Sequence, residues 1–180
     1  MSGPSVKKSP SAVFKVKEMV VKTSLLTLGV VFEMVSKHSR EMKDELKDWD
    51  EGRVLCLGVL PDGPSIAVRK EGGILRYLGK GEHNADLKIL FKNMDAAFMM
   101  LSGQIGSHTG FAEHRAVVHG SLYAAMQANR AMALVTKFLF PGFMLKGITR
   151  RMPEMTGSDL LLKARVMATL TPALLINMSK

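Results

Sequence analysis

The sequence predicts an α+β protein, in which a mostly antiparallel sheet of five strands is combined with an N-terminal helical region and later helices. Two observations predict this class. Over about residues 12–51, apolar residues recur every three or four positions, the period of an amphipathic helix. From residue 53 the pattern changes to short apolar or alternating runs bounded by Gly- and Pro-containing turns, which is typical of strands.

The N-terminal part divides into a Pro- and Ser-rich tail over residues 1–10, expected to be flexible, and a helical region over residues 11–51. A break near His38–Ser39 would divide that region into two helices. Its apolar stripe consists of Phe14, Val21, Leu25, Leu28, Phe32 and Val35. The longest uncharged run, residues 23–32, has ten residues, whereas a bilayer span needs about 20. We therefore expect a helix of the mature protein and not a signal peptide.

Four short runs after Gly52 predict strands. They cover residues 53–60, 65–70, 74–80 and 85–92. The first run is apolar on both faces, and the last one alternates clearly between apolar and polar residues. Tight turns between consecutive strands predict an antiparallel meander, because parallel neighbours need a long crossover.

The next segment predicts a helix, a fifth strand and a long helix. Asn93 is expected to cap a helix that ends at Gly103. Residues 104–113 are expected to form a loop or a short helical turn, and residues 114–120 a strand that places His119 on a polar, partly solvated face. Ser121 then caps a long helix that continues to about Phe140.

The segment over residues 141–180 is predicted to be helical and apolar nearly all round. A helix without a polar face must be buried, either by this chain or by a partner. Methionine is also abundant, with 14 copies in 180 residues. These side chains either fill the core or form an apolar surface that adapts to irregular guests.

The formal net charge of +9 favours anionic surfaces, which include nucleic acid, acidic phospholipid and acidic proteins. The sequence contains no zinc finger, recognition helix or aromatic-studded basic strand, so nucleic acid is not an expected partner. A solvated basic face without a specific partner is the default interpretation. The single cysteine, Cys56, fits an inert buried thiol and a reducing compartment, so we expect a cytoplasmic location.

The histidines and hydroxyl residues do not form a catalytic or metal-binding motif. His108, His114 and His119 are spaced by six and five residues, which is not a ligand spacing for zinc. In "GSHTG", His108 occupies the position at which a nucleophile elbow carries serine. We therefore expect no catalytic residues, no metal, no cofactor and no enzymatic activity.

Residues 79–126 resemble the signature of the sterol carrier protein 2-like lipid-binding domains. The matching residues are Gly79, Lys80, Gly81, Ala85, Asp86, Asp95, Gly103, Phe111, Arg115 and Gly120. The resemblance extends over roughly residues 52–138. It departs from the family at His114, where a glycine is common, and at the start of the last helix, where "GSLYAAM" replaces a lysine-rich segment.

The resemblance implies a sheet with helices on one side and an apolar tunnel for a fatty acyl chain, a sterol or a polyprenyl lipid. The lipid-binding core would then be residues 52–140. By position, the candidate lining residues are Phe91, Phe98, Leu101, Phe111, Met126, Met132, Val135 and Phe138. We expect a non-catalytic intracellular lipid-binding or carrier protein.

Two other hypotheses stay open. The protein is alternatively an interaction or accessory module, as some bacterial family members are in isoprenoid quinone synthesis. Such a module would dock partners, or a second copy of itself, through the apolar helices of residues 141–180. Transient contact of the basic ends with an anionic membrane surface is compatible with the carrier hypothesis.

Overall fold

The structure is a computed structural model that describes residues 12–139, 157, 160–164 and 168. The predicted tail over residues 1–10 and most of the predicted segment over residues 141–180 lie outside these described residues. Within that last segment, residues 160–164 are helical.

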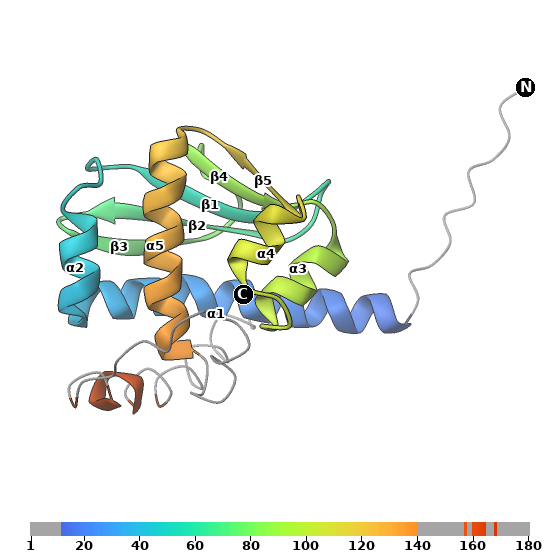
Figure 1. Ribbon diagram of the computed structural model, residues 1–180, viewed down its shortest axis with the longest axis horizontal. Helices are drawn as coiled ribbons and strands as arrows, with labels where there is room; N and C mark the ends of the chain where they lie inside the picture. The colour runs from blue at the N-terminus through green and yellow to red at the C-terminus, as the bar shows by residue number, and fades with distance from the viewer. Residues whose placement is uncertain (1–11, 140–156, 158–159, 165–167, 169–180) are drawn as a thin grey trace, which may run out of the picture.

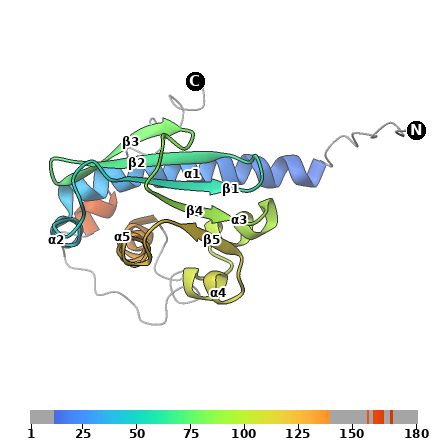
Figure 2. The same ribbon diagram turned by 90° about the horizontal axis from the view of Figure 1, so that it is seen from above.

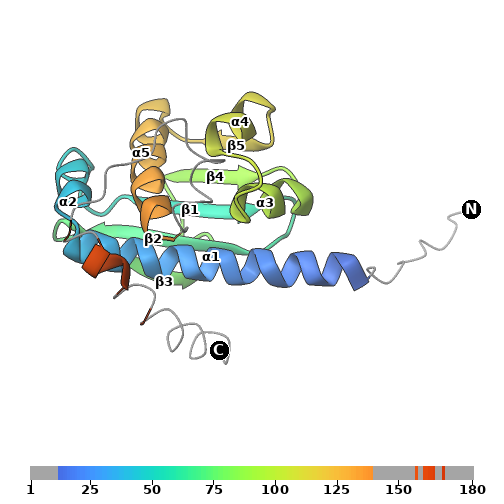
Figure 3. The ribbon, with the colours of Figure 1, turned by 60° about the horizontal axis from the view of Figure 1, so that its bottom comes forward.

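The described chain forms one five-stranded sheet whose helices lie against one face (Figures 1 and 3). The elements, in chain order, are α1 (Ala12–His38), α2 (Arg40–Leu46), β1 (Val54–Val59), β2 (Ser65–Glu71), β3 (Ile74–Lys80), β4 (Leu87–Phe91), α3 (Met94–Leu101), α4 (Ser107–Ala112), β5 (Ala116–His119) and α5 (Leu122–Leu139). The strand order is β3-β2-β1-β4-β5. The predicted α+β class with a mostly antiparallel sheet is confirmed, and residues 104–113 contain a short helix.

The prediction of a simple meander is wrong for β4. This strand pairs with β1 in parallel, whereas β1–β2, β2–β3 and β4–β5 are antiparallel. Residues 81–86 leave β3 and cross β2 and β1 to reach the other side of β1 (Figure 2). The arrangement makes β1 a central strand, and all six of its residues are buried. Burial on both faces is what its uninterrupted apolar sequence favours.

Several residues of the family signature build the turns around this crossover. The Asp86 carboxylate accepts a hydrogen bond from the backbone N–H of Val54 at 2.9 Å, which ties the crossover to β1. Gly120 has φ +126° and lies so close to the Asp86 carbonyl that a Cβ atom would approach it to 2.6 Å. Gly79 and Gly81 also have positive φ, at +107° and +105°. These signature residues thus have structural roles.

The apolar stripe of α1 packs on the sheet, and its residues Val21, Leu25, Phe32 and Val35 are at most 1% exposed. Among the described helices, α1 alone is long and apolar enough to cross a membrane by length and composition. Half of the apolar window of α1 is buried inside the protein. A core helix meets the same criterion, so packing on the sheet accounts for the apolar character of α1.

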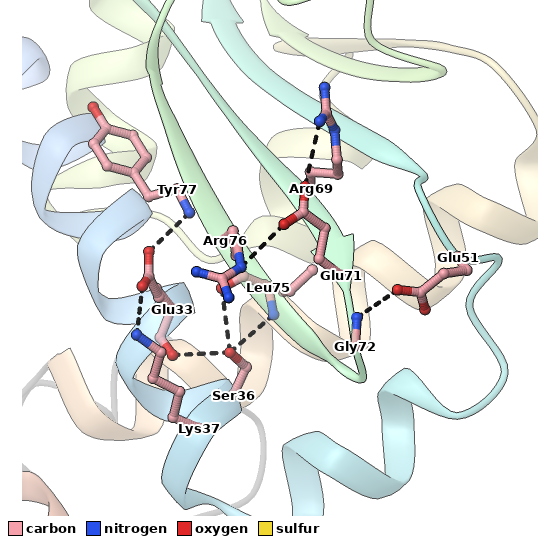
Figure 4. Close-up of polar contacts among 10 residues, drawn as sticks. All are labelled: Glu33, Ser36, Lys37, Glu51, Arg69, Glu71, Gly72, Leu75, Arg76 and Tyr77. Atoms are coloured by element: carbon pink, nitrogen blue, oxygen red, sulfur yellow. Dashed lines mark hydrogen bonds and ion pairs between the residues drawn. The ribbon is translucent and has the colours of Figure 1, made fainter.

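Side chains of α1 also cover the free edge of the sheet at β3 (Figure 4). Ser36 Oγ accepts a hydrogen bond from the backbone N–H of Leu75 at 3.0 Å, and Glu33 Oε2 accepts one from the N–H of Tyr77 at 3.0 Å. An uncovered edge strand would offer these donors to another chain. Helix α1 therefore both buries a face of the sheet and closes its edge.

The predicted helix boundaries follow from local capping. Ser39 separates α1 from α2, and its side chain accepts a hydrogen bond from the N–H of Met42. Asn93 caps α3 in the same way through the N–H of Ala96. The fifth strand begins at Ala116, two residues later than predicted, because His114 has φ +53°, which is incompatible with a strand.

Candidate functional site

A cavity of about 260 Å³ lies between the helices and strand β4. Its walls come from α1, β4, α3, α4 and α5 and from Ile105 in the α3–α4 connection. The lining residues are Thr23, Ser24, Thr27, Leu28, Ile89, Phe91, Met100, Leu101, Ile105, Ser107, Phe111, Asn129, Met132, Ala133, Thr136 and Leu139. The walls thus combine long apolar side chains with several small polar ones.

The apolar walls follow from the periodicity of each element. Ile89 and Phe91 alternate along β4, so both point from the sheet toward the helices. Helix α3 adds Met100 and Leu101, and α4 adds Phe111. Methionine is flexible and polarisable, so its side chain adapts to guests of different shape.

The polar wall comes mainly from α1 and α5. Thr23 and Thr27 are four residues apart and share one face of α1. On α5, Asn129 and Thr136 face the same space. The Thr136 hydroxyl donates a hydrogen bond to the backbone carbonyl of Met132 at 2.8 Å, so it faces the cavity chiefly as an acceptor.

The structure brings together half of the predicted lining residues. Phe91, Leu101, Phe111 and Met132 line the cavity. The other four, Phe98, Met126, Val135 and Phe138, are not among the residues that line it.

Helical periodicity explains the places of the α5 residues. Asn129, Met132, Ala133 and Thr136 form the face of α5 that lines the cavity. Val135 and Phe138 are fully buried in the core on a neighbouring face. Met126 is 56% exposed near the start of the helix.

Phe98 is half-buried on α3. The ammonium of Lys17 stands 5.9 Å from the centre of its ring, and the same ammonium pairs with Asp95 at 2.6 Å. These contacts hold α3 against α1.

Sequence reasoning missed the polar residues of the lining. A cluster of hydroxyl residues, Thr23, Ser24 and Thr27, interrupts an otherwise apolar helix, and that interruption was the available signal. The cluster lies beside the apolar stripe that packs on the sheet, and apolar periodicity alone does not indicate that it faces a cavity.

The described residues contain no group of three or more His, Cys, Asp or Glu side chains that could hold a metal ion. His108, His114 and His119 are all exposed. Cys56 is fully buried, and desolvation by burial, with a smaller contribution from the carboxylate of Glu82, raises the pKa of its thiol to about 11. Such a thiol is a poor nucleophile near neutral pH.

A second hollow, of about 570 Å³, lies between the N-terminal half of α1 and the β2–β3 side of the sheet. It is larger than the cavity, but three lysines border it, Lys15, Lys22 and Lys80. Two further hollows near residues 50–54 are lined largely by charged and polar residues. Volume favours the second hollow, whereas the aromatic and aliphatic lining makes the cavity the better site for an apolar guest.

The sequence matches no protein family and no curated protein. Solved structures that are similar to this chain include three proteins. "UbiJ-SCP2 Ubiquinone synthesis protein" is 14% identical, with a TM-score of 0.41 over 67% of this chain and 96% of that one. Sterol Carrier Protein 2 from Yarrowia lipolytica in its apo form is 12% identical, with a TM-score of 0.38 over 72% and 94%.

The third structure is Sterol Carrier Protein-2 like-3 from Aedes aegypti. It is 8% identical, with a TM-score of 0.32 over 54% of this chain and 94% of that one. By name, all three belong to the family that residues 79–126 resemble.

Proposed function

We propose that this protein binds a lipid, holds its apolar chain in the cavity between β4 and the helices, and catalyses no reaction. The observation that carries the proposal is an internal space walled by Ile89, Phe91, Leu101, Phe111 and Met132. Binding an apolar chain there needs little polar chemistry, because each Å² of buried apolar surface contributes roughly 25 cal/mol.

The size of the cavity limits the guest. Its volume of about 260 Å³ lies just below the range of about 300–1,000 Å³ usual for small-molecule sites. One fatty acyl chain, or part of a polyprenyl chain or of a sterol, would fill it, with adjustment of Met100 and Met132. The guest would meet solvent beside Asn129 and Ala133, the lining residues of α5 that are exposed.

The test compares Ala133→Trp with Met126→Trp. Ala133 is exposed and lines the cavity, so tryptophan would block the opening without disturbing the core. Met126 is exposed on the same helix but does not line the cavity, which makes it the matched control. We expect native mass spectrometry and displacement of a fluorescent acyl probe to detect lipid on the wild type and on Met126→Trp only. Absence of lipid from all three proteins, or equal binding by all three, would contradict the proposal.

We also propose that the N-terminal end of α1 contacts an anionic membrane during lipid exchange. This end projects beyond the sheet (Figure 3) and exposes Val13, Val16 and Met19. The exposed lysines Lys15 and Lys22 lie among these apolar side chains. A helix end that combines basic and apolar residues is suited to an anionic lipid surface.

Vesicle flotation tests this contact. Val16→Asp should weaken flotation with acidic vesicles, and added salt should weaken it for the wild type. Leu122→Asp is the control, because Leu122 is 76% exposed at the start of α5. An equal loss of vesicle flotation in the two variants would argue against a specific role for α1 in membrane contact.

The alternative role, an accessory module that docks through residues 141–180, has limited support among the described residues. Leu160 and Leu161 are 59% and 76% exposed, whereas Leu162 is buried. Lys163 donates a hydrogen bond to the carbonyl of Lys137 near the end of α5, at 3.3 Å. If this segment docks a second copy or a partner, Leu160→Glu with Leu161→Glu should reduce the mass measured by light scattering.

A further inference from the structure

We infer that the cavity selects lipids whose polar end is an uncharged oxygen group, a hydroxyl or a carbonyl, over lipids that end in a carboxylate or a phosphate. This inference rests on the proposed lipid-binding function and adds the class of ligand. It comes from the polar wall of the cavity, formed by Thr23, Ser24 and Thr27 of α1 opposite Asn129 and Thr136 of α5.

The hydroxyls of α1 are available to a ligand. Among the described residues, the side chains of Thr23, Ser24 and Thr27 make no hydrogen bond to the protein. Each can donate one hydrogen bond and accept others. Three such groups on one helix wall can satisfy both the hydrogen and the oxygen of a neutral hydroxyl, or the oxygen of a carbonyl.

The part of the wall that the structure describes contains no Lys, Arg or His. The neighbouring cations are engaged elsewhere. Lys22, next to Thr23, pairs with Glu18 at 2.7 Å and borders the other hollow. Lys137, next to Thr136, pairs with Glu41 at 3.3 Å. Among the residues that the structure describes, a carboxylate in the cavity would therefore have no cationic partner.

Because of desolvation, the lack of a cation in the described wall favours neutral lipids over anionic ones. An ionised group that leaves water without a partner loses far more hydration free energy than a hydroxyl that gains new hydrogen bonds. The net charge of +9 attracts anions to the surface, but long-range attraction is screened by salt, whereas the desolvation penalty inside the cavity is not. The lining of the cavity thus outweighs the net positive charge of the chain and disfavours a lipid that ends in an anion.

The experiment is competition against one fluorescent acyl probe by two ligands of equal chain length, 1-hexadecanol and hexadecanoate, at neutral pH. The full chain is used. We expect hexadecanol to displace the probe at a concentration at least about tenfold lower, the factor that corresponds to one well-made hydrogen-bonded group.

Two variants connect the preference to α1. Thr23→Val with Thr27→Val keeps side-chain size and removes both hydroxyls, so the affinity for hexadecanol should fall severalfold while that for hexadecanoate changes little. Thr109→Val on α4 is the control, because Thr109 is not a lining residue. In a separate protein, Thr27→Lys supplies the missing cation and should reverse the preference.

The outcomes separate this inference from the function on which it rests. Equal or tighter binding of hexadecanoate by the wild type overturns the selectivity and leaves lipid binding intact. An unchanged preference in both Thr→Val and Thr27→Lys proteins also overturns it. If the acyl probe and both ligands fail to bind, the proposed lipid-binding function is contradicted together with the selectivity.

Discussion

The carboxylate of Glu33 in α1 accepts a hydrogen bond from the backbone N–H of Tyr77 in the edge strand β3, at 3.0 Å (Figure 4). One helical turn further along, Ser36 accepts the N–H of Leu75. Two side chains of a helix thus take the place of a neighbouring strand. The same helix carries Gly29 under the ring of Tyr77, where a Cβ atom would come within 2.5 Å of the ring.

The first prediction concerns acid stability. Partial burial by itself raises the pKa of Glu33, but hydrogen bonds from Lys37 and the Tyr77 amide, together with the charges of Lys37 and Arg76, lower it below the ordinary 4.5. A lowered pKa in the folded state means that the stabilisation is present above about pH 4.5 and disappears as the pH falls further.

Glu33→Gln should remove this pH dependence. At neutral pH the variant should unfold with a free energy lower by on the order of 1 kcal/mol, because water partly screens the pair with Lys37. At about pH 3.5 the difference from the wild type should shrink. Urea unfolding at the two pH values measures it, and a difference that does not change with pH would contradict the prediction.

Ser36→Ala tests the closure of the sheet edge. Ser36 is fully buried, so the substitution leaves the N–H of Leu75 without its acceptor. We expect a loss of about 1–3 kcal/mol in the free energy of unfolding. Lys43→Ala, at an exposed position of α2, serves as control and should stay within about 0.5 kcal/mol of the wild type. An effect of Ser36→Ala as small as the control would show that water satisfies this amide.

Gly120 and Gly79 form a matched pair in the family signature. Both have positive φ, +126° and +107°, so alanine is strained by about 1–3 kcal/mol at either position. Only at Gly120 would the added Cβ also meet backbone, the carbonyl oxygen of Asp86 at 2.6 Å. Gly120→Ala should therefore lower the melting temperature clearly more than Gly79→Ala. Similar losses would mean that β4 and β5 separate at little cost.

Cys56 reports on the opening of the sheet. Its pKa of about 11, raised from 9.0, lowers the thiolate fraction at pH 8 by about 100-fold. Because the thiol is also inaccessible, labelling by a thiol reagent should be negligible in the folded protein and complete in guanidinium chloride. The labelling rate should rise with denaturant together with global unfolding. Rapid labelling of the native protein would indicate that the crossover over residues 81–86 opens locally.

Local patterns determined most of the elements. The 3.6-residue period of α1, the alternation along β4, and the capping residues Ser39 and Asn93 each depend on neighbours within a few positions. These features act in the same way in any fold. The α+β class and the helix boundaries could therefore be predicted from the sequence.

The parallel pairing of β4 with β1 could not be predicted in this way. The connection after β3, residues 81–86, is short enough to suggest a direct reversal of the chain. The uninterrupted apolar sequence of β1 is typical of a central strand, but it does not say which strand becomes its second neighbour. The residues that line the cavity could not be predicted for the same reason, because they depend on how distant segments pack. Met132 and Val135 are both apolar residues of α5, yet one lines the cavity and the other fills the core.

The sequence by itself determined where the helices and strands form and which of their faces are apolar, because those properties depend on short-range periodicity and capping. Only the tertiary structure decided which apolar faces meet and where they leave a space between them. It also decided that three hydroxyls of α1 face that space. The physical reason is that packing depends on how distant segments fit together. The spacing of residues within any one segment does not determine this fit.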